Sequence, residues 1–224
     1  MAELPEITCV APRVEGKNGH AGNGVVYNPI DVHITKAKNR EIKYIVIHYT
    51  AGRKSTEGSA EAERKVFINQ KASADFIVDD QIMLQVNPDP HNYYCWAVGD
   101  GKGKYGITNK DCVSIEICST LEKGTTYKMP NHEGWSFSED SLNNAIELTK
   151  ILMSIYHIPI ENVIRHYDVS HKCCPGLLGW NPGTIYDAKT GNATKEKNTE
   201  EKWEEFKAKL IEEPEEEELL TESK

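Results

Sequence analysis

The feature that most constrains the fold is the continuous apolar run from Tyr44 to Ile47 in the segment EIKYIVIHYTAG. β-Branched and aromatic residues without polar alternation indicate a strand that is buried on both faces, and Ala51-Gly52 ends it. Such a strand needs a covering layer on each side of its sheet. His48 follows the run directly, so we expect it at the carboxyl end of the strand.

A second strand is expected in CVSIEIC, residues 112–118, where apolar and polar side chains alternate with a period of two. A strand glutamate usually points at solvent, but Glu116 lies within an otherwise apolar segment. Its carboxylate is therefore a candidate for a functional site. One face of the strand carries Val113, Ile115 and Ile117, and the other carries Ser114, Glu116 and Cys118.

The clearest helix is predicted over residues 138–157. Ser138 is a good N-cap, acidic residues follow it at the positive end of the helix, and Pro159 lies just beyond the expected stop. A broad apolar face, suited to packing on a sheet, consists of Leu142, Ala145, Ile146, Leu148, Ile151, Leu152 and Ile155.

Further elements alternate along the chain. Helix formers at apolar spacing predict helices over 59–70 and 200–213, two apolar runs around an acidic turn predict a hairpin over 73–86, and 162–168 is strand-like. Strands mixed with helices that cover a sheet predict an α/β fold with a central mixed β-sheet flanked by helices.

The length of 224 residues is enough for one sizeable core. Residues 1–40 are rich in Gly, Asn, Pro and Lys and are expected to be an irregular lead-in with at most one strand. One domain is expected over 41–212. The acidic residues 213–224 are expected to form a disordered tail.

The charge balance argues against nucleic acid as a partner. Acidic residues outnumber basic ones by 35 to 26, which gives a formal net charge of −9. A chain of this charge has no sequence-independent attraction for polyphosphate.

The first 16 residues, MAELPEITCVAPRVEG, lack a basic segment followed by an apolar run of the length that a secretory signal needs. No segment has the length and hydrophobicity of a membrane span. We therefore expect a protein without a signal peptide that is cytoplasmic on synthesis.

Six cysteines lie at positions 9, 95, 112, 118, 173 and 174, a spacing unlike that of a small disulfide-stapled domain. Without a secretory signal, reduced thiols are the expectation. A cysteine in this chain is then of most interest as a metal ligand.

The segment RHYDVSHKCCPG, residues 165–176, has the donors of a metal site. His166 and Cys174 are eight residues apart, and Pro175 imposes a turn directly after the thiol, so both side chains can be directed to one point. Imidazole and thiolate suit Zn²⁺, and a catalytic zinc takes three protein ligands and leaves a fourth position open. His48 supplies the third ligand.

Each of these residues has a simpler interpretation. A lone histidine after a strand is more often a hydrogen-bonded structural residue than a ligand. Cys173 competes with Cys174 for the metal, although the spacing to His166 and Pro175 favours Cys174, and His171 is a further candidate ligand.

Taken together, IVIHYTAG, SIEIC and HYDVSHKCCPG strongly resemble the type 2 N-acetylmuramoyl-L-alanine amidases, which include phage endolysins, muropeptide-recycling amidases and the peptidoglycan recognition proteins. The resemblance covers roughly residues 42–210, including a final W-x2-F helix. Any one of these motifs alone would be a weak signal, whereas their order and spacing together are specific.

The resemblance implies a zinc amidase catalytic domain over 41–212, with the zinc site at the edge of the sheet in an open cleft. It implies His48, His166 and Cys174 as zinc ligands, Glu116 as the catalytic acid and base, and Lys172 as the residue that helps to polarise the scissile carbonyl. The alternative for Lys172 is a solvated surface lysine.

The chain departs from the family at NYYCWAVGDG, where Trp96-Ala97 stands in place of a Trp-His pair. A histidine often found at the substrate cleft is therefore absent. Trp96 is expected to line the cleft, since an aromatic face suits a sugar ring, although a core tryptophan is an equal alternative. Tyr49, beside His48, is also expected to contact substrate.

The expected function is zinc-dependent hydrolysis of the amide between N-acetylmuramic acid and L-alanine by a phage-type lytic enzyme that acts on the cell wall. The expected partner is peptidoglycan, and we expect a monomer. Alternatives are a muropeptide-recycling amidase and a recognition module without activity, although modules that only bind typically lack the cysteine ligand. A structural zinc site is disfavoured, because such sites are usually closed by four Cys or His ligands.

Overall fold

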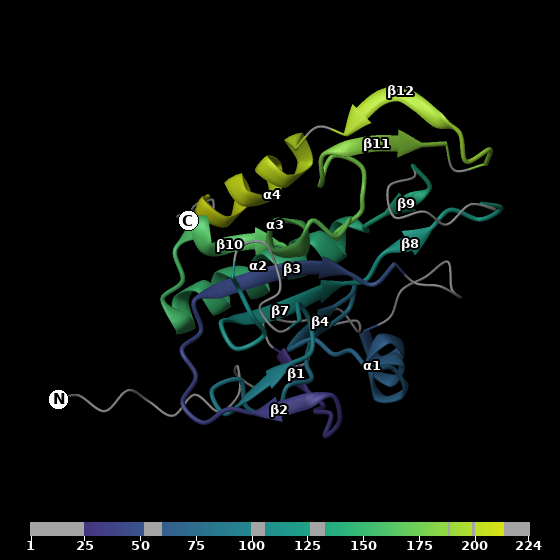
Figure 1. Ribbon diagram of the computed structural model, residues 1–224. Coiled ribbons are helices and arrows are strands. Elements are labelled where there is room, and N and C mark those ends of the chain that lie inside the picture. Colours follow the sequence, from purple (N-terminus) through teal and green to yellow (C-terminus); the bar gives the residue numbers. More distant parts are fainter. Residues whose placement is uncertain are drawn as a thin grey trace, which may run out of the picture.

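A six-stranded mixed sheet forms the centre of the computed structural model (Figure 1), which describes residues 25–51, 60–99, 106–125, 133–187, 189–198 and 200–212. The strands lie in the order β1 (Val25–Tyr27), β5 (Met83–Gln85), β4 (Phe76–Val78), β7 (Cys112–Ile117), β3 (Tyr44–Tyr49) and β10 (Val163–Arg165).

The register of the parallel strands determines where polar side chains meet. Strand β3 pairs in parallel with β7 on one side and with β10 on the other, and His48 lies directly opposite Glu116. Residue His166 follows β10 immediately. The carboxyl ends of these three strands therefore meet at one end of the sheet, which is where open α/β sheets commonly bind ligands.

Helix α2 (Glu139–Tyr156) packs on one face of the sheet, and α4 (Glu201–Ile211) packs against α2 (Figure 1). Ser138 caps α2 as predicted, because its hydroxyl accepts the amide N–H of Ser141 at 3.1 Å. The main core joins apolar side chains of α2 and α4 to the inward-facing residues of the strands. All seven predicted apolar positions of α2 belong to this core or pack against it.

The opposite face carries α1 (Ala60–Asn69) and α3 (His166–Ser170). Phe67 of α1 packs on Ile77 and Leu84 of the sheet. Val169 of α3 belongs to a separate small cluster with Val46. Because side chains alternate along a strand, His48 and Glu116 point to this second face.

In the described part of the chain, three two-stranded pairs accompany the central sheet, together with the short 3-10 helix η2 (Ile160–Asn162). They are β2 (Ile34–Lys36) with β6 (Tyr93–Cys95), β8 (Thr120–Leu121) with β9 (Trp135–Ser136), and β11 (Gly183–Tyr186) with β12 (Ala193–Asn198).

The α/β class and the mixed central sheet with flanking helices are confirmed. Residues 25–40 are more regular than the irregular lead-in predicted over 1–40, because β1 pairs with β5 and β2 pairs with β6. Strand β1 precedes residue 41, where the catalytic domain is predicted to begin, and the predicted domain bounds stay a prediction. Residues 1–24 and the predicted tail, 213–224, lie outside the described residues.

Within the described ranges, no helix has both the length and the apolar character needed to cross a membrane. Cys9 lies outside the described residues. The described cysteines are free thiols, namely Cys95, Cys112, Cys118, Cys173 and Cys174.

Candidate metal centre

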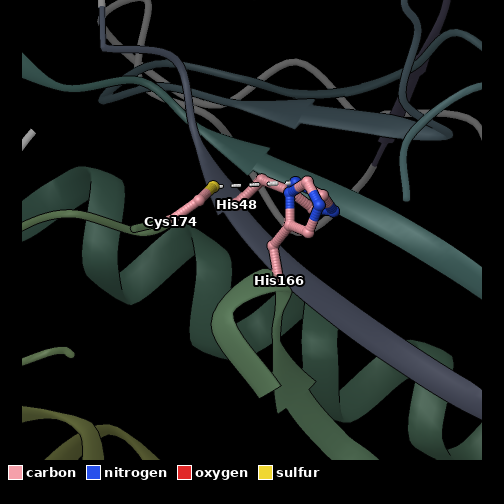
Figure 2. A group of neighbouring side chains, drawn as sticks. All are labelled: His48, His166 and Cys174. Carbon is pink, nitrogen blue, oxygen red and sulfur yellow. Dashed lines mark hydrogen bonds between the residues drawn. The ribbon is translucent and has the colours of Figure 1, made fainter. Parts of the chain in front are cut away.

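His48, His166 and Cys174 come together at the carboxyl ends of β3 and β10 (Figure 2). One donor atom from each residue lies within 4.8 Å of the others, and all three side chains are buried. The Cys174 Sγ is 3.7 Å from His48 Nδ1, and the two imidazole centroids are 4.5 Å apart.

Backbone hydrogen bonds hold His166 and Cys174 close to each other. The amide N–H of Tyr167 donates to the carbonyl of Cys174 at 2.9 Å, which ties the cysteine to the start of α3. The Asp168 carboxylate accepts the amide N–H of Arg165 at 2.8 Å, and this bond stabilises the first turn of that helix. The eight-residue segment therefore folds back on itself.

Glu116 lies beside this group, on the neighbouring strand. Its Oε1 is 3.9 Å from His48 Nδ1, and its side chain is 16% exposed. We call these four residues the His48 cluster: His48, Glu116, His166 and Cys174. The arrangement places one carboxylate next to two imidazoles and a thiol on one face of the sheet.

Burial keeps the members of the His48 cluster neutral. It lowers the pKa of His166 to about 4. It also lowers the pKa of His48, and electrostatic repulsion from His166 and Lys172 lowers that pKa further. It raises the pKa of Cys174, with a further contribution from Glu116. Neutral imidazole is the form that binds metal, and a bound cation would favour the thiolate.

Burial also raises the pKa of Glu116 to about 8, repulsion from Glu63 adds to the rise, and Lys172 opposes it. A carboxyl group with this pKa can exchange a proton near neutral pH, as a catalytic acid and base must. Sequence reasoning gave Glu63 no role, because a glutamate in a charged, partly exposed helix looks like part of a solvated surface.

Three buried polar atoms of the His48 cluster lack a hydrogen-bond partner among the described residues: His48 Nε2, Glu116 Oε2 and His166 Nδ1. Leaving a buried polar atom unpaired costs free energy, so such atoms are uncommon. Two imidazoles and one thiol are donors that zinc accepts, and three protein ligands are typical of an open catalytic site. The residues present therefore fit a zinc ion.

Lys172 is exposed and lies two residues before Cys174. Its positive charge contributes to the lowered pKa values of both histidines. The lysine is thus electrostatically coupled to the His48 cluster.

The two competing ligand candidates lie apart from the donor group. The three residues that can share one ion include Cys174. Cys173 and His171 are also among the described residues, but they do not belong to this group. Cys173 is partly buried, and burial raises the pKa of its thiol while a hydrogen bond from Asn181 lowers it. His171 is exposed, in the left-handed position that ends α3, with its ring near Tyr167.

The side chains of the two residues expected to contact substrate lie outside the His48 cluster, although the Tyr49 backbone forms a hydrogen bond with the Cys174 side chain. The Tyr49 side chain is 6% exposed and packs edge-on against Trp135 in the main core. Trp96 is 40% exposed, so it is not a core tryptophan, and its Nε1 donates to Thr35 Oγ1 at 2.8 Å. Contact of either residue with substrate stays a prediction.

Known proteins of similar sequence are N-acetylmuramoyl-L-alanine amidases. The Amidase_2 family, described as N-acetylmuramoyl-L-alanine amidase, matches residues 38–177. The N-acetylmuramoyl-L-alanine amidase CwlH of Bacillus subtilis strain 168 is 33% identical over 141 residues, which cover 62% of this chain and 50% of CwlH. The chain thus spans half the length of this relative.

Two solved structures are also similar. PlyL is 30% identical, with a TM-score of 0.51, and the match covers 68% of this chain and 86% of PlyL. A mutant endolysin from Bacillus subtilis is 26% identical, with a TM-score of 0.55, and the match covers 83% of this chain and 97% of the endolysin.

Proposed function

Because the chain belongs to the Amidase_2 family of N-acetylmuramoyl-L-alanine amidases, we propose that it is a zinc hydrolase of peptidoglycan. The bond it cleaves is the amide between N-acetylmuramic acid and the L-alanine of the stem peptide. The observation that carries the proposal is the His48 cluster, in which two imidazoles and a thiol converge beside a carboxyl group of raised pKa.

His48, His166 and Cys174 are the residues that would hold zinc. Bound there, zinc would supply Lewis acidity, which polarises an amide carbonyl and makes water a competent nucleophile near neutral pH. The three ligands leave room for this chemistry, because a structural site would use a fourth protein ligand. Among the described residues, the donor group holds these three and no fourth.

Glu116 is the proposed catalytic acid and base. It takes a proton from the attacking water and passes it to the leaving nitrogen, so that the departing group is a neutral amine. Its raised pKa, about 8, favours the protonated form that gives a proton to the leaving nitrogen. A bound cation would favour the ionised form that first takes a proton from water. The Oε2 of Glu116 is buried without a hydrogen-bond partner among the described residues, which leaves that oxygen available to a reacting group.

Lys172 is proposed to stabilise the negative charge that develops on the scissile carbonyl oxygen. Its coupling to both histidines and to Glu116 supports a place at the mouth of the site. A lysine without a catalytic role would also be exposed. A catalytic Lys172 is therefore distinguished from a solvated surface lysine by its effect on turnover and not by an effect on metal binding.

The proposed partner is peptidoglycan, and the proposed role is lytic, in which the protein acts on the bacterial cell wall. Similarity to an endolysin from Bacillus subtilis supports lysis over recycling of soluble fragments. The placement of Cys174 with the two histidines supports an enzyme over a module that only binds the wall.

The deciding experiment is digestion of purified peptidoglycan, with and without a zinc chelator, followed by mass spectrometry of the released fragments. We expect free stem peptides with an L-alanine amine, their loss on chelation and their return on addition of zinc. Intact muropeptides beside wall-bound protein would overturn the proposal in favour of a recognition module. Cleavage of soluble muropeptides but not of intact wall would overturn the lytic role alone.

A further inference from the structure

A cavity of about 560 Å³ lies apart from the His48 cluster, between the β2–β6 pair and the turn before β7. It shares no residue with the cluster, and the proposed chemistry does not use it. Its volume is within the range of small-ligand sites. The lining consists of Thr35, Tyr94, Trp96, Gly99, Thr108, Asn109 and Lys110.

The aromatic wall of the cavity is fixed in place. The Trp96 indole N–H donates to Thr35 Oγ1 at 2.8 Å, and its ring centroid lies 5.4 Å from that of His33. The amide N–H of Trp96 donates to Ser73 Oγ at 2.8 Å. A side chain that is 40% exposed and still held this firmly loses little conformational entropy when a ligand covers it.

The turn before β7 is fixed equally firmly. Asn109 Oδ1 accepts three consecutive amide N–H groups, from Ala97 at 3.0 Å, Val98 at 2.7 Å and Gly99 at 3.1 Å. The amide N–H of Asn109 donates back to the carbonyl of Gly99 at 3.1 Å. The segment after Trp96 is thereby clamped to the turn that carries Lys110.

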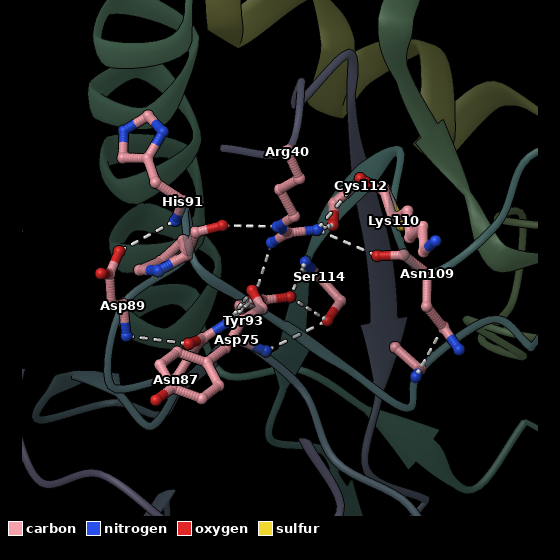
Figure 3. A network of polar contacts seen from close by, with 12 residues as sticks. Arg40, Asp75, Asn87, Asp89, His91, Tyr93, Asn109, Lys110, Cys112 and Ser114 are labelled. Carbon is pink, nitrogen blue, oxygen red and sulfur yellow. Dashed lines mark hydrogen bonds and ion pairs between the residues drawn. The ribbon is translucent and has the colours of Figure 1, made fainter. Parts of the chain in front are cut away.

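A buried polar network holds the two walls together (Figure 3). The Arg40 guanidinium donates to the carbonyl of Pro90, before β6. It also donates to the carbonyls of Asn109, before β7, at 2.9 Å and of Cys112, the first residue of β7, at 2.7 Å. Asp75 pairs with Arg40 at 3.3 Å.

Asp75 also joins the network to the central sheet. It accepts both the amide N–H and the hydroxyl of Ser114 at 2.9 Å. The Asn87 side-chain amide also donates to the Asp75 carboxylate, at 2.5 Å. We call this group the Arg40 network: Arg40, Asp75, Asn87, Asn109 and Ser114. A network of this kind preorganises the cavity without taking part in the proposed hydrolysis.

We propose that this cavity binds an N-acetylated sugar of the glycan strand, a second contact that rests on the proposed function. Two aromatic side chains offer apolar faces to a sugar ring, and two threonines offer hydroxyl groups at its edge. Among the described residues of the lining, Lys110 is the one charged side chain, which favours a mostly neutral occupant. Such a contact would hold the enzyme on glycan while the His48 cluster acts on the peptide linkage.

The test is titration of the full chain with the N-acetylglucosamine trimer, followed by amide chemical shifts. This probe has neither muramic acid nor a stem peptide, so its binding is independent of amide hydrolysis. We expect shift changes at Gly99, Thr108 and Lys110, and affinity at least about five-fold weaker in Trp96→Ala, as for a hot-spot aromatic. Trp96→Phe, which keeps a ring, is expected to retain part of the affinity.

Tyr27→Ala is the matched control, because Tyr27 is an aromatic residue 49% exposed outside the cavity. It should bind the trimer like the wild type. Absence of binding by the wild type, or unchanged affinity in a folded Trp96→Ala, would overturn the proposal. Loss of trimer binding in Lys110→Met but not in Trp96→Ala would mean that the lysine, and not the aromatic wall, holds the sugar, and would also overturn the proposal.

Discussion

The His48 cluster and the Arg40 network are both buried polar groups on the same sheet, yet they differ in how their atoms are paired. In the Arg40 network, Asp75 accepts hydrogen bonds on both carboxylate oxygens, and Arg40 donates from all three of its nitrogens. In the His48 cluster, one atom each of His48, Glu116 and His166 has no partner among the described residues.

The difference indicates what each group contributes. A satisfied network recovers the cost of burying its charges and fixes the backbone around it. An unsatisfied cluster lowers stability and persists where a ligand or a reaction uses the free atoms. The comparison therefore predicts that mutations in the two groups will affect different measurements.

Replacement of a metal ligand should give the largest effect. We expect His166→Ala to lose bound zinc and all wall hydrolysis, because two remaining ligands do not make a catalytic site. The zinc-free variant should differ little in stability from the zinc-free wild type, because removal of the unpaired buried Nδ1 offsets part of the cost of the cavity that the truncation leaves. Zinc content, turbidity of a wall suspension and urea unfolding measure these three results.

His171→Ala is the matched control for this change. His171 is exposed and lies outside the donor group, so the variant should keep its zinc. Loss of zinc in His171→Ala, with zinc retained in His166→Ala, would reverse the ligand assignment.

Glu116→Gln should separate proton transfer from metal binding. We expect zinc content to stay unchanged while turnover falls by about 10²- to 10⁴-fold, the range for loss of a general acid and base. Glu63→Gln is the control, because the only effect of Glu63 in the proposed mechanism is that its charge raises the pKa of Glu116. Full activity of Glu116→Gln with bound zinc would contradict the proposed role.

Asp75→Ala should affect stability instead of the metal. Arg40 would remain buried without its carboxylate, which typically costs about 3 to 5 kcal/mol in the free energy of unfolding. The folded variant should keep its zinc, because Asp75 does not belong to the donor group. Urea unfolding and zinc content measure the two results.

Glu41→Ala is the control for Asp75→Ala, since it removes one partner of the exposed ion pair between Glu41 and Lys43. Exposed pairs add little stability, so its unfolding midpoint should hardly move. If Asp75→Ala unfolds like the wild type but loses zinc, the distinction between the two groups fails.

The same contrast explains how much the sequence could predict. The fold class, the strand ending at His48 and the inward face of Glu116 follow from periodicity, which is a local property of a strand. His166 and Cys174 lie within one short segment, so their convergence could be inferred from spacing and from the family resemblance. These features could be predicted without knowing which residues distant in the sequence contact each other.

The Arg40 network could not be predicted in this way. Its ion pair joins residues 35 positions apart, and in the sequence each looks like a surface charge near a turn. The β11–β12 pair was also missed, because its Gly-, Asn- and Thr-rich sequence resembles a loop. Both features depend on tertiary contacts that outweigh local preference.

Cys173→Ser should give the smallest effect and tests how narrowly the His48 cluster is defined. Cys173 adjoins Cys174 but lies outside the donor group, so zinc content should be unchanged and activity should stay within about two-fold, as for substitutions away from special features. Cys174→Ser is the matched comparison and should lose both zinc and activity. If Cys173→Ser loses zinc while Cys174→Ser keeps it, the neighbouring thiol is the ligand.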